Sequence, residues 1–180
     1  MHIGCMPCSI GIGTVYPQDP GISSFSDGAS GERITVHGSV VDGAGQALCD
    51  AMLESWQPDA QGRFTGSEGA DPYVSGFCRF ATDFSSGEFT LHTIKPGPVK
   101  SRGAVNQAPH ISLWIVARGI NIGLHTRLYF EDEDNSSDPL LNRIEQRSRV
   151  NTMIARKTSE SEYRFDIHLQ GDNETVFLDL

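Results

Sequence analysis

Residues 87–130 read GEFTLHTIKPGPVKSRGAVNQAPHISLWIVARGINIGLHTRLYF, and the rest of the chain is organised around this stretch. The alternation in EFTLHTI places Phe89, Leu91 and Thr93 on one face and polar side chains on the other. A period of two is typical of a half-buried strand. The sequence KPGP at 95–98 ends this strand, because two prolines cannot continue its hydrogen-bonding pattern.

Short apolar or alternating runs recur along the whole chain and predict a series of strands. The run 110–118 is rich in apolar and β-branched residues, so we expect a strand that is buried on both faces. Further strands are predicted over 32–42, 47–57, 77–83, 124–130, 163–170 and 174–180. Turn residues at 42–45 and 171–173 favour a hairpin between the first two of these and another between the last two.

These patterns predict an all-β sandwich with one or two short helices near 138–157. Asp138 followed by Pro139 is a typical helix start, and 150–157 adds further helical turns. We expect two parts, a truncated N-terminal arm over 1–31 and a sandwich domain over 32–180.

Composition excludes several classes of protein. The chain has 180 residues, a net charge of −9 and a pI near 5, which argue against a nucleic-acid-binding face. No run of apolar residues is long enough to span a membrane. Because the start carries no signal-peptide pattern, we expect a cytoplasmic protein with reduced thiols.

Three other features could bind a metal or carry redox chemistry, but each has a plainer interpretation. Cys5 and Cys8 have the C-x-x-C spacing, without the following helix of a redox site or the second pair of a zinc site. The acidic run 131–134 lacks the glycine and distal glutamate of a calcium loop, so a solvated turn is favoured. Four histidines stand alone on predicted strands and are expected on polar faces: His37, His92, His125 and His168.

The motif T-x-K-P-G-P at 93–98, followed by A-P-H-I at 108–111, resembles the core of the intradiol ring-cleaving dioxygenases. Catalytic chains of that family carry K-P-G-P-Y and R-P-A-H-I-H. The continuation A-R-G-I-N at 117–121 is similar to the non-catalytic alpha chains of protocatechuate-cleaving members. The resemblance implies the intradiol sandwich fold and extends more loosely over nearly the whole chain. The sequence L-E-S-W-Q-P-D-A at 53–60 resembles the family's E-V-W-Q-A-D-A, which implies that Trp56 packs in the core between the sheets.

The resemblance also implies a ligand set, and this chain lacks most of it. The family holds Fe(III) with two tyrosinates and two histidines, which are donors suited to that ion. Val99 replaces the tyrosine of K-P-G-P-Y, Ser112 replaces the second histidine, and Gln107 replaces the arginine of R-P-A-H. His110 alone matches a ligand and is interpreted as vestigial. The fourth position falls in 63–79, where Tyr73 is the only tyrosine.

We therefore expect a chain without metal and without catalytic residues, acting as the alpha subunit of a hetero-oligomer. A homologous beta subunit would hold Fe(III), and protocatechuate and O2 would meet at the shared pocket. Arg118 is the candidate substrate-binding residue, because a ring carboxylate needs a local positive charge in an acidic protein. Two alternatives remain open, namely a stand-alone dioxygenase using Tyr73, His92 and His110, and a non-enzymatic binding sandwich.

Overall fold

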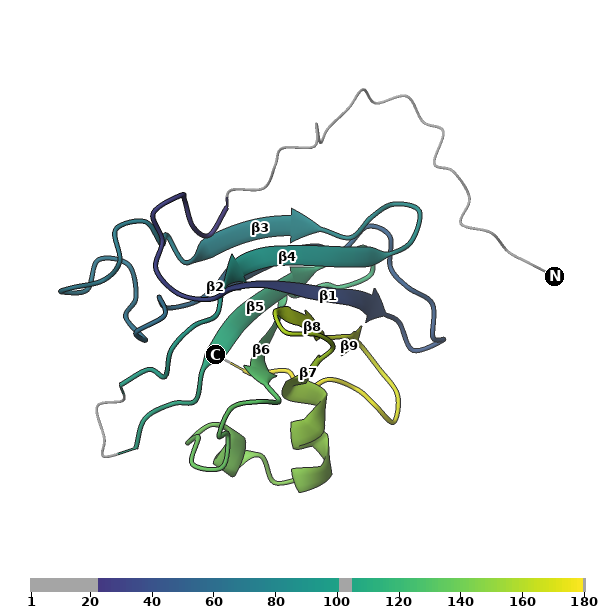
Figure 1. Cartoon of the computed structure of the whole chain (residues 1–180). Helices are drawn as coiled ribbons and strands as arrows, with labels where there is room; N and C mark the ends of the chain where they lie inside the picture. Colours follow the sequence, from purple (N-terminus) through teal and green to yellow (C-terminus); the bar gives the residue numbers. More distant parts are fainter. Residues whose placement is uncertain (1–22, 101–104, 180) are drawn as a thin grey trace.

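The computed structural model describes residues 23–100 and 105–179. Two layers of strands face each other (Figure 1). The strands are β1 (Arg33–Val41), β2 (Met52–Trp56), β3 (Phe77–Ala81), β4 (Glu88–Ile94), β5 (His110–Val116), β6 (Leu124–Phe130), β7 (Ile154–Lys157), β8 (Glu162–Arg164) and β9 (Ile167–His168). The all-β sandwich predicted from the sequence is confirmed.

The layers are named here after their central strands. The β1 layer contains β4, β1, β8 and β9, and the β5 layer contains β3, β2, β5, β6 and β7. β7 pairs with β6 in one layer and with β8 in the other. A single hydrogen-bonded path therefore joins the two layers at this edge.

The core lies between the two layers because alternate residues of each strand point inward. β4 has the predicted alternation, with Phe89 and Leu91 almost fully buried and Glu88 exposed. β5 contributes Ile111, Leu113 and Ile115 from the opposite layer. Burying side chains of this size stabilises each layer against the other by about 1.5–3 kcal/mol per residue.

The predicted hairpin between residues 32–42 and 47–57 forms only its turn and an isolated antiparallel bridge between Val41 and Ala47, and the predicted pairing of the two strands is wrong. The turn forms, since the Asp42 carboxylate accepts hydrogen bonds from the backbone N–H groups of Ala44 and Gln46. The chain then crosses to the other layer, so β1 pairs with β4, β8 and β9 while β2 pairs with β3 and β5. A turn signal fixes the local direction of the chain but not its pairing partner.

Two predictions of burial in the β5 layer are also wrong. In β2, alternation sends Leu53 and Ser55 into the core, so Trp56 points outward and is 43% exposed. It stacks on Phe64 at 6.3 Å between ring centroids. In β5 one face is buried, whereas the other, including Trp114, is only half-buried. The outer face of this layer is therefore partly apolar.

The helical segment is shorter than predicted and consists of the 3-10 helices η1 (Leu141–Arg143) and η2 (Arg147–Met153). Residues 154–157, predicted as helical, form strand β7 instead. Their partners β6 and β8 are distant in sequence, and pairing with both outweighs the local preference for a helix.

The closing hairpin predicted over 163–170 and 174–180 does not form as two strands. Residues 163–170 divide into β8 and β9. Residues 174–179 carry no named strand, although Thr175 donates its backbone N–H to the His168 carbonyl oxygen at 2.9 Å. Leu178 forms an isolated bridge with His125 on β6. The end of the described chain therefore lies against the β5 layer.

A buried hydrogen bond holds the N-terminal part of the described chain against β4. Ser24 shares a hydrogen bond of 2.7 Å with Thr93 on β4, and Thr93 donates to the Gln57 side-chain oxygen. The rest of the predicted arm, residues 1–22, lies outside the described residues, as do Cys5 and Cys8. The proposed boundary at residue 31 stays a prediction.

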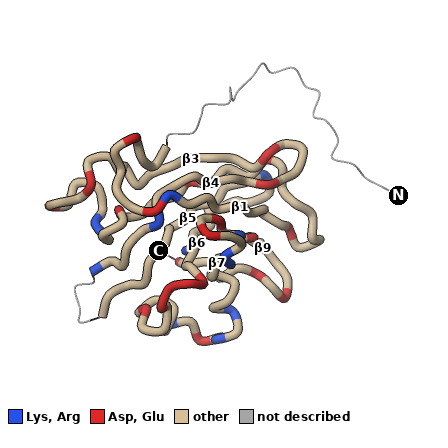
Figure 2. Tube along the Cα trace, in the orientation of Figure 1, with Lys and Arg blue, Asp and Glu red and all other residues tan. Residues whose placement is uncertain are grey.

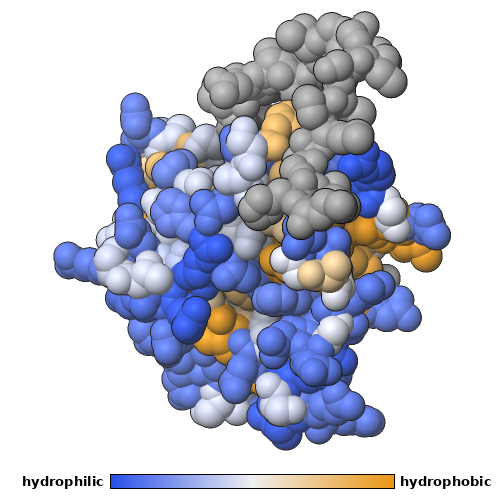
Figure 3. Space-filling view, turned by 90° about the vertical axis from the view of Figure 1, so that its right-hand side faces the viewer, coloured by the Kyte–Doolittle hydropathy of each residue, from blue (hydrophilic) through white to orange (hydrophobic). Residues whose placement is uncertain are grey.

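The surface carries acidic and basic residues scattered over many loops (Figure 2). The face in Figure 3 is mainly hydrophilic, with separate apolar patches. Among the described residues, no helix has the length and apolar character needed to cross a membrane.

Candidate functional site

The residues matched to the family's ligand motifs come together at one end of β5. Val99 and Gln107 lie in the loop before β5 and exchange backbone hydrogen bonds of 3.0 and 2.9 Å. His110 and Ser112 begin β5 and point to the same side, because they are two residues apart on a strand. The motif positions therefore adjoin one another although only His110 keeps a donor of the family set.

Arg127 on β6 completes this group, which we call the vestigial site: Val99, Gln107, His110, Ser112 and Arg127. In the β5–β6 pairing, Ser112 lies opposite Arg127, and His110 lies opposite Tyr129. Residues opposite each other in an antiparallel pair have Cβ atoms about 4.5–5.5 Å apart. The Arg127 guanidinium reaches across and donates to Gln107 Oε1 at 2.8 Å.

His110 is held as a neutral imidazole. Its side chain is buried, and its Nδ1 lies 2.7 Å from the Ala108 carbonyl oxygen, which can only accept, so Nδ1 carries the hydrogen. Burial and the positive charge of Arg127 together lower the pKa of His110 to about 4. At neutral pH the ring is therefore uncharged. It packs against the Tyr129 ring, with 5.6 Å between the two ring centroids.

A buried carboxylate fixes the backbone around this histidine. Asp138 accepts hydrogen bonds from the backbone N–H groups of Ala108, Leu140 and Leu141 at 2.9–3.0 Å. It also accepts from the Tyr129 hydroxyl at 3.2 Å. Burial raises the pKa of Tyr129, so this hydroxyl keeps its proton at neutral pH and donates it to Asp138. Asp138 thus joins the start of β5 to the turn before η1.

The residues of the vestigial site do not fit a ferric ion. Val99 offers no donor atom, and Ser112 offers a neutral hydroxyl where the family has an imidazole. The Arg127 guanidinium adds a positive charge that a metal ion would have to approach. Over 23–100 and 105–179, no group of three or more His, Cys, Asp or Glu side chains is placed to hold a metal.

The alternative ligand set of Tyr73, His92 and His110 is not assembled. His92 points outward from β4 and shares a 3.2 Å hydrogen bond with Thr35, whereas His110 lies on the outer face of the opposite layer. A single metal ion cannot bridge the outer faces of two layers that enclose a core, since packed sheets lie about 10 Å apart.

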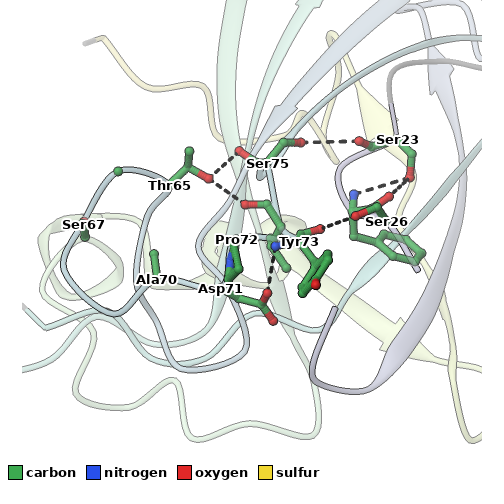
Figure 4. A pocket seen from close by; sticks show the side chains of 12 residues that line it. Ser23, Ser26, Thr65, Ser67, Ala70, Asp71, Pro72, Tyr73 and Ser75 are labelled. Atoms are coloured by element: carbon green, nitrogen blue, oxygen red, sulfur yellow. Dashed lines mark hydrogen bonds between the residues drawn. The ribbon is translucent and has the colours of Figure 1, made fainter. Parts of the chain in front are cut away.

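Tyr73 belongs to a different hollow. It lines a cavity of about 390 Å³ between residues 23–26 and 65–75 (Figure 4). Its backbone is held by Ser26 and by the Asp71 carboxylate, and its ring packs against Gly28 while remaining 52% exposed. Apart from Tyr73 and the Asp71 carboxylate, which accepts backbone hydrogen bonds, the polar side chains lining this cavity are serine and threonine hydroxyls, and the lining includes no imidazole.

Arg118 lies at the other end of β5, in the turn before β6. Its side chain is 83% exposed and its Nε lies 3.3 Å from Asp50. Six residues of strand separate His110 from Val116, a span of about 20 Å. Arg118 therefore cannot act on anything held at the vestigial site of its own chain, but it is free to contact a neighbouring molecule.

Comparison with known proteins agrees with this architecture. The family model described as "Dioxygenase" matches residues 14–171. The chain is similar to the structure of 3-chlorocatechol 1,2-dioxygenase from Rhodococcus opacus, with a TM-score of 0.63 and 22% identity over 81% of this chain. It spans 63% of that structure's chain, less than two thirds. The chain belongs to the intradiol dioxygenase family.

Within the family, the similarity is strong to one kind of chain. The protocatechuate 3,4-dioxygenase alpha chain of Pseudomonas putida is 48% identical over 84% of this chain and 78% of the relative. The beta chain of the same enzyme from Burkholderia cepacia is 30% identical, over 81% of this chain and 67% of the relative. Alpha and beta chains thus share the fold, and this chain resembles the alpha type more.

Sequence reasoning missed Arg127. The motif comparison points only to residues that replace ligands, and Arg127 replaces none. The available signal was the alternation in LHTRLYF, which puts Arg127 and Tyr129 on one face of a strand. Their position beside His110 and Ser112 depends on the pairing register, which no local pattern specifies.

Proposed function

We propose that this chain is the non-catalytic alpha subunit of a protocatechuate 3,4-dioxygenase and acts together with a homologous beta chain. The observation that carries the proposal is the vestigial site, an intradiol fold in which a single family donor, His110, remains beside a fixed arginine. The identity to alpha chains supports the same assignment. The ferric ion would then be held by the beta chain.

The complete enzyme would insert both atoms of O2 between the two phenolic carbons of protocatechuate and form 3-carboxy-cis,cis-muconate. This chain would contribute part of the pocket wall and a positive charge for the substrate's carboxylate. Arg118 suits that task because its exposed guanidinium stands at the tip of a loop and a guanidinium pairs well with a carboxylate. We propose a cytoplasmic location for the assembly.

Co-expression tests the assignment. The chain would be purified alone and together with the beta-type chain encoded by the same host, and iron content and protocatechuate-dependent O2 uptake would be measured for both preparations. We expect iron and activity in the joint preparation and neither in the chain alone. An isolated chain that binds stoichiometric Fe(III) and cleaves protocatechuate would refute the proposal.

The same experiment separates the proposal from a binding protein of the same fold. The chain would be a non-enzymatic binding protein if it remained a monomer in the presence of the beta-type chain and did not change the activity of that chain. A stand-alone dioxygenase would show the visible absorption of tyrosinate bound to Fe(III), whereas the positions of Tyr73, His92 and His110 predict a colourless protein.

A further inference from the structure

The vestigial site contains a charge that the loss of ligands alone does not explain. Arg127 forms no ion pair within 23–100 and 105–179, and its guanidinium donates to the neutral Gln107 side chain. Within the same residues, its Nε is buried without a hydrogen-bond partner. Arginine cannot lose its proton under protein conditions, so the guanidinium brings a full positive charge into this site.

Polar side chains surround the positive charge of Arg127. The Tyr129 hydroxyl lies close to Arg127 on the same outer face, and it donates in turn to the Asp138 carboxylate. Burying an unpaired charge is costly unless neighbouring groups compensate it. Gln107 Oε1 and the Tyr129 hydroxyl therefore supply oxygen atoms around a cation that is part of the chain itself.

We propose that Arg127 has taken over the positive charge of the former metal site, so that the site now excludes metal ions by charge as well as by missing donors. Arg127 pairs with Ser112, which stands where the family has its second histidine. The Arg127 guanidinium donates to Gln107, which stands where the family has an arginine. Arg127 lies on β6, outside the family motif, yet it adjoins two positions of that motif.

This proposal leads to a specific consequence. Restoring donors to the chain is not sufficient to restore metal binding, because an incoming cation meets the fixed positive charge of Arg127 within the same site, and like charges at short range repel. Removing Arg127 is required as well. The consequence concerns the isolated full-length chain, so it can be tested whether or not the chain proves to be an alpha subunit.

The test compares four variants. The donor variant carries Val99→Tyr and Ser112→His, which with His110 supplies three donors. The other three add Arg127→Gln, Arg127→Met or Arg127→Lys to these two changes. Glutamine and methionine remove the charge while keeping a long side chain, and lysine keeps the charge. Thermal unfolding of each variant identifies those that fold. Two neutral replacements are included so that the comparison still stands if one of them does not fold.

Each folded variant is titrated with ferric nitrilotriacetate. Bound iron is measured after gel filtration, together with the visible absorption of tyrosinate coordinated to Fe(III). We expect the neutral variants to bind Fe(III) at least about 100-fold more tightly than the donor variant and the Arg127→Lys variant. Equal binding by the donor variant and the neutral variants would overturn the proposal, as would a lack of binding by all four, because the charge would then make no difference.

Discussion

At the scale of single residues, the role proposed for Arg118 requires an exposed side chain to act outside the pockets of its own chain. Its guanidinium stands in the turn after β5 and forms an ion pair with Asp50. In the assembled enzyme, replacing Arg118 with alanine should raise KM for protocatechuate about 10-fold to 100-fold, because a charge-assisted hydrogen bond is worth about 1.5–3 kcal/mol. Steady-state kinetics on protocatechuate and on catechol, which lacks the carboxylate, measures the effect.

Asp50 provides the matched control for this prediction. Asp50→Ala breaks the ion pair with Arg118 but leaves the guanidinium in place. We expect it to leave KM unchanged or to lower it, since the arginine loses a competing partner. If Asp50→Ala and Arg118→Ala raised KM equally, the ion pair rather than a contact with substrate would explain both results. A smaller effect of Arg118→Ala on catechol than on protocatechuate assigns the contact to the carboxylate.

Asp138 is the residue whose loss should cost the most stability near the vestigial site. It is fully buried and accepts hydrogen bonds from three backbone N–H groups and from Tyr129. Asp138→Ala would leave these donors unpaired, so we expect a loss of about 3 kcal/mol or more in the free energy of unfolding. Urea denaturation measures it. Asp134→Ala, which removes an exposed carboxylate bonded to Ser136, should change stability by less than about 0.5 kcal/mol.

At the scale of elements, a carboxylate after β6 joins the two layers at the edge where β7 links them. Asp132 accepts from Lys95 at 3.0 Å, from Lys157 at 2.8 Å and from the Tyr163 hydroxyl. Burial acts to raise the pKa of Asp132, but the hydrogen bonds from Lys157, Lys95 and Tyr163 outweigh it and lower the pKa to about 2. The acidic turn, expected to be solvated, is thus partly a structural contact.

This contact predicts a pH dependence of stability. Because the folded-state pKa lies below the unfolded value of about 3.9, the contribution of Asp132 is complete above that value and is lost as pH falls through about 2. Between pH 7 and pH 2.5, the wild type should therefore lose about 1–2 kcal/mol more than Asp132→Asn. Urea denaturation at the two pH values tests this, and equal losses would show that Asp132 does not couple folding to protonation.

The elements also show which features the sequence could predict. In β4 the alternation of Phe89 and Leu91 predicted both the strand and its buried face, because the period of two is a local property. For Trp56 the family resemblance predicts a place in the core, although the alternation of Leu53 and Ser55 sends it outward. Residues 154–157 form a strand where the sequence predicts a helix, because their strand partners lie far away in the sequence and leave no local signal.

At the scale of the whole molecule, the candidate site depends on which strands become neighbours. The motif around His110 was enough to predict the fold and the missing ligands. The place of Arg127 requires β5 and β6 to pair with Ser112 opposite Arg127, and the separation of Arg118 from His110 requires β5 to run straight between them. Pairing register and strand direction belong to the assembled sandwich, so no single segment specifies them.

The partly apolar outer face of the β5 layer and the exposed Arg118 imply that the chain is more stable in its assembly than alone. A partner that binds only the folded chain stabilises it by about 2.7 kcal/mol when present at 100 times its Kd. For a chain of this size, that corresponds to a rise in Tm of roughly 5–10 °C. Differential scanning calorimetry of the chain with increasing amounts of the beta-type chain should show Tm rising with partner concentration. A Tm that does not respond, in mixtures where the beta-type chain is folded, would contradict an obligate pairing of the two chains.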